Sequence, residues 1–499
     1  MNPEFSKMYP TYLGKKGYVL LKDNLSSSQL NELKKKLTVK PKIIASMGGI
    51  SKSFPVYRES IKKIYIPRYF GINNFGHVQE NQLNDGIQIN VPFSGSLRDH
   101  QKPAVASFLN YCSLTNHASG LLELDCAAGK TVLSLYIISS LKTKTLIIVN
   151  KEFLLNQWIE RITEFLPTAR IGRIQGKMID IEEKDIVIGM LQSLSMKEYD
   201  QTLFDSFGFT ILDEVHHISS EVFSNALFKI VTKYMLGLSA TMERKDGTSD
   251  VIKMFLGEVI YKGNNTEKHD VKVRAIQYIT NNDEFNKTEV DYRGNVMYST
   301  MIVKLCNYQP RSDFIIKMVE DLIKVDPNKQ ILLLGHNRSL LYYLYETIIE
   351  KKFASVGYYL GGMKQSILDE SRNKQIIVGS HNMCSEGLDI STLSTLIFVT
   401  PKTDIVQSVG RILRTKHNNP IVIDIIDSHQ VFQNQWKKRR LYYKKENYKI
   451  QTITSHKYKN MISIEEKEEK EENEEKEENE EKEEKNIPKC LLLSLINER

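Results

Sequence analysis

Residues 120–131 join an apolar run to a Gly-Lys-Thr triplet, in the order GLLELDCAAGKT. A tight loop that opens a helix directs backbone N–H groups and the helix N-terminus at phosphate oxygens. Lys130 would neutralise the charge of the terminal phosphates, and Thr131 would ligate Mg²⁺. The strict pattern needs glycine where Leu124 stands, so this segment alone also fits a chance triplet at a helix start. The backbone of the loop would come from Cys126, Ala127, Ala128 and Gly129.

A second polar group, DEVHH at residues 213–217, follows the apolar run FTIL. Asp213 at a strand end can reach Mg²⁺ through the water shell of the ion, and Glu214 can orient and deprotonate an attacking water. The alternative is a polar strand end that caps a helix. The position of the group after the phosphate loop, in the same parallel sheet, favours catalysis. We expect His216 to couple the triphosphate site to another lobe, and we assign no role to His217.

Two further segments carry side chains suited to a triphosphate. GLSATMERKDG follows an apolar run and places the hydroxyls of Ser239 and Thr241 beside the site. QSVGRILR begins at Gln407 and spaces Arg411 and Arg414 three residues apart, so that they share one helix face. Two fixed guanidiniums can stabilise the transition-state charge on a γ-phosphate, as arginine fingers do. A basic surface helix is the alternative for this segment on its own.

Short apolar strands that alternate with helix-length segments must position these residues, and they predict parallel α/β sheets. The expected strands of the first alternation are 120–124, 145–149, 185–189, 208–212 and 236–240. Those of the second are 330–334, 354–359, 375–379, 395–399 and 421–425. We therefore expect a small α+β module at 1–95, α/β lobes at 96–260 and 311–450, a connector at 261–310, and a charged, disordered tail at 451–499.

The distribution of charge favours a polyanionic partner. The net charge of the 499 residues is +7, but residues 465–485 alone hold 14 Glu and 5 Lys. Without this tract 63 basic and 47 acidic residues remain, a net charge of +16. So basic a body fits nucleic acid, with simple solubility as the alternative. The expected helix at 428–445 is itself strongly basic.

Other features predict a soluble intracellular protein without membrane contact. No apolar run approaches the roughly 20 residues of a membrane helix. The opening MNPEFSKMYP lacks the basic-then-apolar pattern of a signal peptide. The five cysteines are scattered without a Cys-x-x-Cys pair, so we expect free thiols and no zinc site. For a viral protein, the host cytoplasm and the virion are the expected locations.

Taken in order, the phosphate loop, DExH, Ser-Ala-Thr and Q-x-x-G-R-x-x-R resemble the signature motifs of superfamily 2 helicases, over about residues 95–445. The resemblance implies two tandem RecA-like lobes, ATP and Mg²⁺ as cofactors, and nucleic acid as partner. LRDHQ resembles the motif that contacts adenine, with Gln101 on the base edge and Arg98 assisting. SEGLDI resembles a motif that places Gly387 and Asp389 near ATP and the bound strand.

Within the superfamily, LxCxAGK[ST], Asn followed by Gln-Trp, and DEVH are most similar to the DNA helicase of the TFIIH transcription-repair complex and to helicases of large cytoplasmic DNA viruses, the poxvirus transcript-release type. Segments like those at 17–41 and 66–71 precede the motor in that group, where they imply an accessory nucleic-acid-binding module. Ala127 stands where the transcription-repair helicase has glycine. The resemblance implies a DNA-dependent ATPase that translocates on duplex DNA and unwinds it, with the transcription machinery as a further partner. An RNA helicase, or an ATP-gated clamp or transcription-factor subunit without unwinding, are the alternatives.

Overall fold

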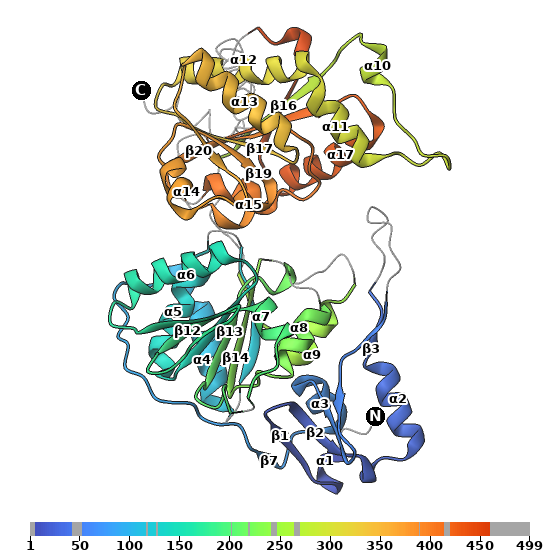
Figure 1. The fold of residues 1–499 in the computed structure, drawn as a ribbon, viewed down its shortest axis with the longest axis vertical. Helices are drawn as coiled ribbons and strands as arrows, with labels where there is room; N and C mark the ends of the chain where they lie inside the picture. Colours follow the sequence, from blue (N-terminus) through green and yellow to red (C-terminus); the bar gives the residue numbers. More distant parts are fainter. Residues whose placement is uncertain are drawn as a thin grey trace, which may run out of the picture. The chain divides into compact units, whose positions relative to one another are not determined.

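Two sheets of mostly parallel strands, each covered by helices, make up most of the chain (Figure 1). The computed structural model describes residues 5–41, 52–115, 118–125, 128–200, 202–217, 220–240, 247–263, 270–388, 390–413 and 420–459. The chain divides into two compact units, Met1–Glu267 and Lys268–Arg499. The α/β class that the sequence predicts is confirmed. The Glu/Lys tract at 465–485 lies outside the described residues.

A small five-stranded sheet, in the order β5-β6-β2-β1-β7, opens the first unit. Its strands are β1 (Thr11–Gly14), β2 (Gly17–Leu21), β5 (Arg58–Glu59), β6 (Lys63–Ile66) and β7 (Glu80–Asn81), and a separate pair is formed by β3 (Thr38–Val39) and β4 (Phe54–Pro55). The helices are α1 (Phe5–Met8), α2 (Ser27–Lys36) and α3 (Arg68–Phe75). A capping box between Ser26 and Gln29 fixes the start of α2.

Helix α3 holds this module against the first lobe. The buried guanidinium of Arg68 donates to the carbonyl of Thr232 at 2.5 Å, and the hydroxyl of Tyr69 donates to the carbonyl of Ser119 at 2.7 Å. Apolar residues of the module and the lobe also belong to one continuous core. The module and the first lobe are therefore a single unit.

The first lobe contains an eight-stranded sheet in the order β11-β10-β12-β9-β13-β14-β8-β15, in which all pairs except β10 with β11 are parallel. Its strands are β8 (Ser119–Glu123), β9 (Thr145–Val149), β10 (Ile171–Gln175), β11 (Met178–Asp180), β12 (Ile186–Met190), β13 (Phe209–Leu212), β14 (Tyr234–Ser239) and β15 (Val259–Lys262). Its helices are η2 (Asp99–Gln101), α4 (Lys102–Leu114), α5 (Lys130–Leu141), α6 (Glu152–Phe165), α7 (Leu191–Met196), η3 (Val215–His217), α8 (Ser220–Leu227) and α9 (Ser249–Leu256).

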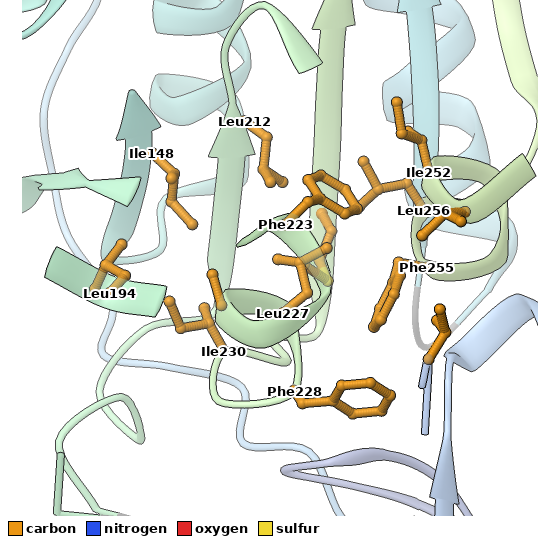
Figure 2. Close-up of a cluster of buried hydrophobic side chains, with 14 of the residues drawn as sticks. Ile148, Leu194, Leu212, Phe223, Leu227, Phe228, Ile230, Ile252, Phe255 and Leu256 are labelled. Atoms are coloured by element: carbon orange, nitrogen blue, oxygen red, sulfur yellow. The ribbon is translucent and has the colours of Figure 1, made fainter. Parts of the chain in front are cut away.

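Helices α8 and α9 cover one face of this sheet through a cluster of aromatic and branched side chains (Figure 2). In α9 the apolar residues recur so that Ile252, Phe255 and Leu256 are buried, and they join Leu212 and Phe223 in one cluster. The ring of Phe255 meets that of Phe228 edge-on, with centroids 5.1 Å apart. Each buried aliphatic or phenyl side chain of this kind contributes about 1.5–3 kcal/mol to folding. The cluster thus fixes the sheet directly beside the carboxyl end of β13, where Leu212 precedes Asp213.

The second unit contains a seven-stranded parallel sheet in the order β18-β19-β17-β20-β21-β16-β22. Its strands are β16 (Lys272–Tyr278), β17 (Gln330–Gly335), β18 (Val356–Tyr359), β19 (Ile376–Ser380), β20 (Leu393–Phe398), β21 (Ile421–Asp427) and β22 (Lys449–Thr454). Its helices are α10 (Asp283–Asn286), α11 (Tyr298–Asn307), α12 (Gln309–Val325), α13 (Arg338–Lys351), α14 (Gln365–Arg372), α15 (His381–Gly387), α16 (Val406–Val409), η4 (Gly410–Leu413), α17 (Gln430–Lys445) and η5 (Ser455–Lys457). In the parts of both units that the structure describes, no helix is long and apolar enough to cross a membrane.

The stretch expected to be a connector contributes a strand to this second sheet. β16 pairs in parallel with β21 on one side and β22 on the other, so the sheet takes in residues well before 311. Lys272, Arg274 and Gln277 interrupt the apolar pattern of β16, although Arg274 is buried. β22 likewise extends past the expected boundary at 450. Long-range pairing fixes both strands, and a local apolar pattern does not reveal it.

Two buried ion pairs tie helices to β21. The guanidinium of Arg311 on α12 makes bonds of 2.6 and 2.9 Å to the carboxylate of Asp427, and both side chains are fully buried. Arg439 on α17 contacts Asp424 in the same two-pronged way, at 2.7 and 2.8 Å. Paired guanidinium and carboxylate groups hold these helices in a defined register on the sheet.

Candidate active site

The phosphate loop leaves the carboxyl end of β8 and enters α5 at Lys130. Gly129, the residue before the helix, has a φ of +73°, which favours glycine. A Cβ at this position would lie 2.2 Å from Nε2 of Gln101, so only glycine lets the Gln101 side chain approach the loop backbone this closely. Cys126 and Ala127 lie outside the described residues. The described part of the loop therefore fits a phosphate cradle.

Lys130 and Glu214 meet at this edge of the sheet. Nζ of Lys130 lies 3.0 Å from Oε1 of Glu214, and the two side chains are only 12% and 14% exposed. Glu214 has a φ of +48°, in the left-handed region that non-glycine residues rarely adopt. Such backbone strain clusters at functional sites because the surrounding structure must hold it. The conformation turns the Glu214 carboxylate toward the loop lysine.

Asp213, the residue before Glu214, is buried. Its backbone N–H donates to the carbonyl of Ile148, and its Oδ2 accepts a 2.9 Å bond from the indole N–H of Trp158 on α6. Burial raises the pKa of the Asp213 carboxyl to about 6, and the neighbouring charge of Glu214 adds to the effect. Lys130 and the Trp158 N–H act in the opposite direction. The site thus holds two carboxylates with different environments.

His216 links the acidic pair to β14. Its Nδ1 lies 3.3 Å from Oε2 of Glu214 and 2.7 Å from the hydroxyl of Ser239, which is fully buried. The loop lysine, the glutamate, the histidine and the serine therefore form one continuous chain of polar contacts. Thr241 lies outside the described residues, and the side chain of His217 is not described.

The two residues expected at the adenine lie beside the phosphate loop. The amide of Gln101 donates to the carbonyls of Ala128 and Gly129 at 3.1 and 3.2 Å, and its oxygen accepts from the N–H of Arg98. The Gln101 side chain is buried, whereas Arg98 is exposed. Gln101 thus braces the loop backbone as the structure stands. Its contact with a base remains a prediction.

Among the predicted residues of the second lobe, Arg411 is the best defined. It lies in η4, is 8% exposed, and donates through Nη1 to the carbonyl of Leu388 at 3.1 Å. Gln407 lies just before it in α16, and Gly387 ends α15 next to Leu388. These three residues therefore come together within the lobe. Asp389 and Arg414 lie outside the described residues.

The structure also shows polar contacts that the sequence did not predict. The Asn-Gln-Trp pattern marks Trp158, but it does not predict the bond of Trp158 to Asp213. In the second lobe, the hydroxyl of Thr400 lies 3.0 Å from Nδ1 of His336 and 3.4 Å from Nε2 of His381. Burial lowers the pKa of His381 well below its ordinary value, so this imidazole is neutral. The three residues are far apart in the sequence, and no local pattern joins them.

Two RecA-like α/β lobes, with a Gly-Lys-Thr loop and an acidic pair at the carboxyl edge of the first sheet, define the class of nucleoside-triphosphate-driven motors. Comparison with known proteins gives the family. Residues 94–244 match the sequence model of a family described as type III restriction enzyme, res subunit. A protein of Acanthamoeba polyphaga mimivirus, L396, provisionally named an ATP-dependent RNA helicase, is 35% identical over 449 residues, which cover 87% of this chain and 85% of the relative.

More distant relatives agree. Protein 161L of invertebrate iridescent virus 6, provisionally named a helicase, is 25% identical and covers 72% of this chain and 85% of its own length. The structure of Saccharomyces cerevisiae Dbp5 bound to RNA and ADP–BeF3 aligns with a TM-score of 0.52 over 72% of this chain and 90% of that chain; at 13% identity it shows the fold alone. The chain belongs to the superfamily 2 helicases, with relatives in large DNA viruses, and it is an ATP-dependent helicase of that family. The resemblance predicted from the motifs is confirmed.

Proposed function

We propose that this protein couples ATP hydrolysis to movement along DNA, separating strands or displacing transcription complexes. The observation that carries the proposal is the contact of Lys130 with Glu214 beside Gly129, in a chain that belongs to a helicase family. The loop that would bind the phosphates therefore lies close to Glu214, the candidate general base, and to the buried carboxylate of Asp213. This arrangement suits phosphoryl transfer, in which positioning and charge stabilisation do most of the work.

In the proposed mechanism, the loop backbone and Lys130 bind the β- and γ-phosphates. Thr131 and Asp213 would hold Mg²⁺, which neutralises phosphate charge when bound. Lys130 would exchange its bond to Glu214 for one to phosphate, and this exchange would free the glutamate to take a proton from water. The Trp158 N–H keeps Asp213 oriented while it is ionised. Gln101 and Arg98 would recognise the adenine.

The second lobe would complete the site. Arg411 and Arg414 would stabilise the charge that develops on the γ-phosphate, with Gln407 positioning them. Gly387 and Asp389 would contact ATP and the bound strand. His216, Ser239 and Thr241 would couple hydrolysis to movement between the lobes. Residues 1–95 would add an accessory nucleic-acid-binding module. Contacts of this kind are directed mainly at phosphates, so sequence preference would be low.

RNA is the second candidate substrate. The mimivirus relative and a 27% identical African swine fever virus protein, QP509L, are both provisionally named ATP-dependent RNA helicases. DNA is favoured here because the DEVH and Asn-Gln-Trp patterns are most similar to those of a DNA helicase. Recognition of RNA would depend on contacts with the 2′-hydroxyl, which the motifs do not specify.

The decisive experiment titrates ATPase activity with single-stranded DNA, duplex DNA and RNA at one fixed salt concentration, beside a strand-displacement assay. Stimulation by DNA well above that by RNA, together with displacement, is the expected result. If RNA alone stimulates hydrolysis, the substrate is RNA and not DNA. Hydrolysis without displacement on any substrate would indicate an ATP-gated clamp. Absence of stimulation by every nucleic acid would refute the motor function.

A further inference from the structure

Helix α17, Gln430–Lys445, has an exposed side that is rich in basic residues, with the exposed Leu441 among them. Its sequence, QVFQNQWKKRRLYYKK, contains no acidic residue. Five cations near its C-terminal end are exposed, and we call them the α17 basic face: Lys437, Lys438, Arg440, Lys444 and Lys445. Within the described parts of the chain, none of the five forms an ion pair or a side-chain hydrogen bond. Their charge is therefore not neutralised by the fold.

The opposite face of the helix is firmly anchored. Phe432, Trp436, Arg439 and Tyr443 are buried. Arg439 makes its two bonds to Asp424 on β21 and a third to the carbonyl of Lys402, and the Tyr443 hydroxyl donates to the same carboxylate at 3.0 Å. The backbone beneath the basic face is thus fixed. Because this backbone is already ordered, it loses little further entropy when the face binds a partner.

Helix stability does not account for the basic face. Cations favour the C-terminal end of a helix, but this effect falls off within the last turn, which holds Lys444 and Lys445. Lys437, Lys438 and Arg440 lie further back. Lys437 and Arg440 are three residues apart, and Arg440 and Lys444 are four apart, spacings at which like charges repel. The sequence therefore maintains a repulsive array that the fold does not need.

The C-terminal end of the basic face lies away from the edge that carries the helicase motifs. α17 follows the carboxyl end of β21 and runs back along the sheet, and β22 then starts at Lys449 opposite Lys272, the first residue of β16. The cations extend from the middle of α17 at Lys437 to its C-terminal end at Lys445, which lies toward the amino ends of the strands. The motif residues Gly387, Gln407 and Arg411 follow the carboxyl ends of β19 and β20. The end of the basic face at Lys444 and Lys445 is therefore distinct from the motif edge, whereas Arg439, in the middle of the helix, still reaches the carbonyl of Lys402 in the loop after β20.

We propose that the α17 basic face is a second nucleic-acid contact surface. It binds the phosphate backbone of a nucleic-acid duplex, in addition to the contacts made at the edge of the sheet that carries the helicase motifs. The inference rests on the proposed function for its partner and goes beyond it in locating a new surface. From Lys437 to Lys445 the helix rises about 12 Å at ~1.5 Å per residue. Phosphates of one strand of a DNA duplex follow each other every ~3.4 Å along the axis, so the face spans about four of them. Both charge and length match a phosphate backbone.

The test is a full-length variant in which all five residues of the basic face are changed to alanine. Alanine preserves the helix, and the side chains are exposed, so the fold should be retained. The control carries five alanines at exposed, scattered cations of the same lobe, with the same loss of charge and the same composition of four lysines and one arginine: Lys287, Arg293, Lys317, Lys324 and Lys351. Unstimulated ATPase activity, equal in all three proteins, verifies folding.

Binding of a duplex is then measured over a range of salt concentrations. Each phosphate contact adds ~0.9 to the slope of log K against log salt, so loss of about four contacts should lower the slope of the basic-face variant by about 3–4, and the variant should bind about ten- to a hundred-fold more weakly near 0.1 M salt. The control should lose less than about 1. If the basic-face variant has the same slope as the control, the proposal is wrong. The acidic tract of this chain, or a partner protein, would then be the ligand of the basic face. If the unmodified protein shows neither duplex binding nor stimulated hydrolysis, the proposed function itself has failed.

Discussion

Lys130 and Glu214 neutralise each other at the edge of the first sheet, with Nζ and Oε1 3.0 Å apart. The lysine that would bind phosphate thus pairs with the glutamate that would activate water. The contact positions both groups in a partly buried site. Binding of a nucleotide would replace this contact with one to phosphate, and so release the base when the substrate is in place. The two residues consequently should fail in different ways when they are substituted.

Lys130→Ala should abolish hydrolysis, with a loss of at least about 100-fold, because the variant lacks the main cation on the β- and γ-phosphates. Nucleotide binding should weaken as well. Steady-state ATPase assays with and without nucleic acid measure the effect. Lys177→Ala, in an exposed turn of the same lobe, is the matched control and should keep full activity. Unchanged turnover in a folded Lys130→Ala protein would refute the phosphate-loop assignment.

Glu214→Gln should keep ATP and Mg²⁺ binding but lose hydrolysis by about 10²–10⁴-fold, the usual contribution of a general base. The amide has nearly the same shape as the carboxylate but cannot accept the proton. The variant should therefore hold ATP and stay on nucleic acid longer than the unmodified protein does. Nucleotide-binding isotherms beside single-turnover hydrolysis separate the two steps. Normal single-turnover hydrolysis would show that another group is the base.

Trp158→Phe should move the acid limb of the ATPase pH profile upward. The Trp158 N–H stabilises the ionised form of Asp213, whose pKa burial has already raised to about 6. Without this donor the pKa rises further, so a higher pH is needed to ionise the carboxylate that would hold Mg²⁺. A shift of roughly one pH unit corresponds to about 1.4 kcal/mol. Trp436→Phe, at the only other tryptophan, should leave the limb unchanged. An acid limb that stays in place in Trp158→Phe would show that the bond does not tune Asp213.

The contrast between Trp158 and Lys130 shows what the sequence could predict. Lys130 follows an apolar strand within a local pattern, so its place at a strand-to-helix turn could be predicted. The bond from Trp158 to Asp213 joins residues that are far apart, and it exists because α6 packs against the sheet beside β13. The same distinction applies to strands. β9 and β17 are continuous apolar runs and were predicted within one residue, whereas charged residues interrupt β16, whose place depends on two distant partners.

Arg311→Met should lower the free energy of unfolding by about 3–5 kcal/mol, because it leaves the fully buried carboxylate of Asp427 without its partner. The double variant Arg311→Met/Asp427→Asn should recover much of this loss, since the uncompensated charge is then absent. Urea unfolding of the full chain, followed by a signal from the second lobe, measures both. The surface pair of Lys324 and Glu320 is the control, and Lys324→Met should cost under about 0.5 kcal/mol. A small effect of Arg311→Met would mean that water or another cation reaches Asp427.

Deletion of residues 465–499 should leave unstimulated ATPase activity intact, because none of the residues assigned to the ATP site belongs to this segment. Its 14 glutamates and 5 lysines at 465–485 carry a charge of −9, which can compete with nucleic acid for the basic body. The deletion should therefore modestly tighten nucleic-acid binding at low salt. The difference should shrink above about 0.2 M, where screening acts over well under 10 Å.

Binding isotherms of the full and shortened chains, each at two salt concentrations, check this prediction. Equal affinities at both concentrations would show that the tract never meets the surface that binds nucleic acid. Weaker binding by the shortened chain at every salt concentration would instead give the apolar segment at 490–496 a part in docking, because loss of an apolar contact is not screened by salt. Tighter binding confined to low salt is the one result that electrostatic competition predicts.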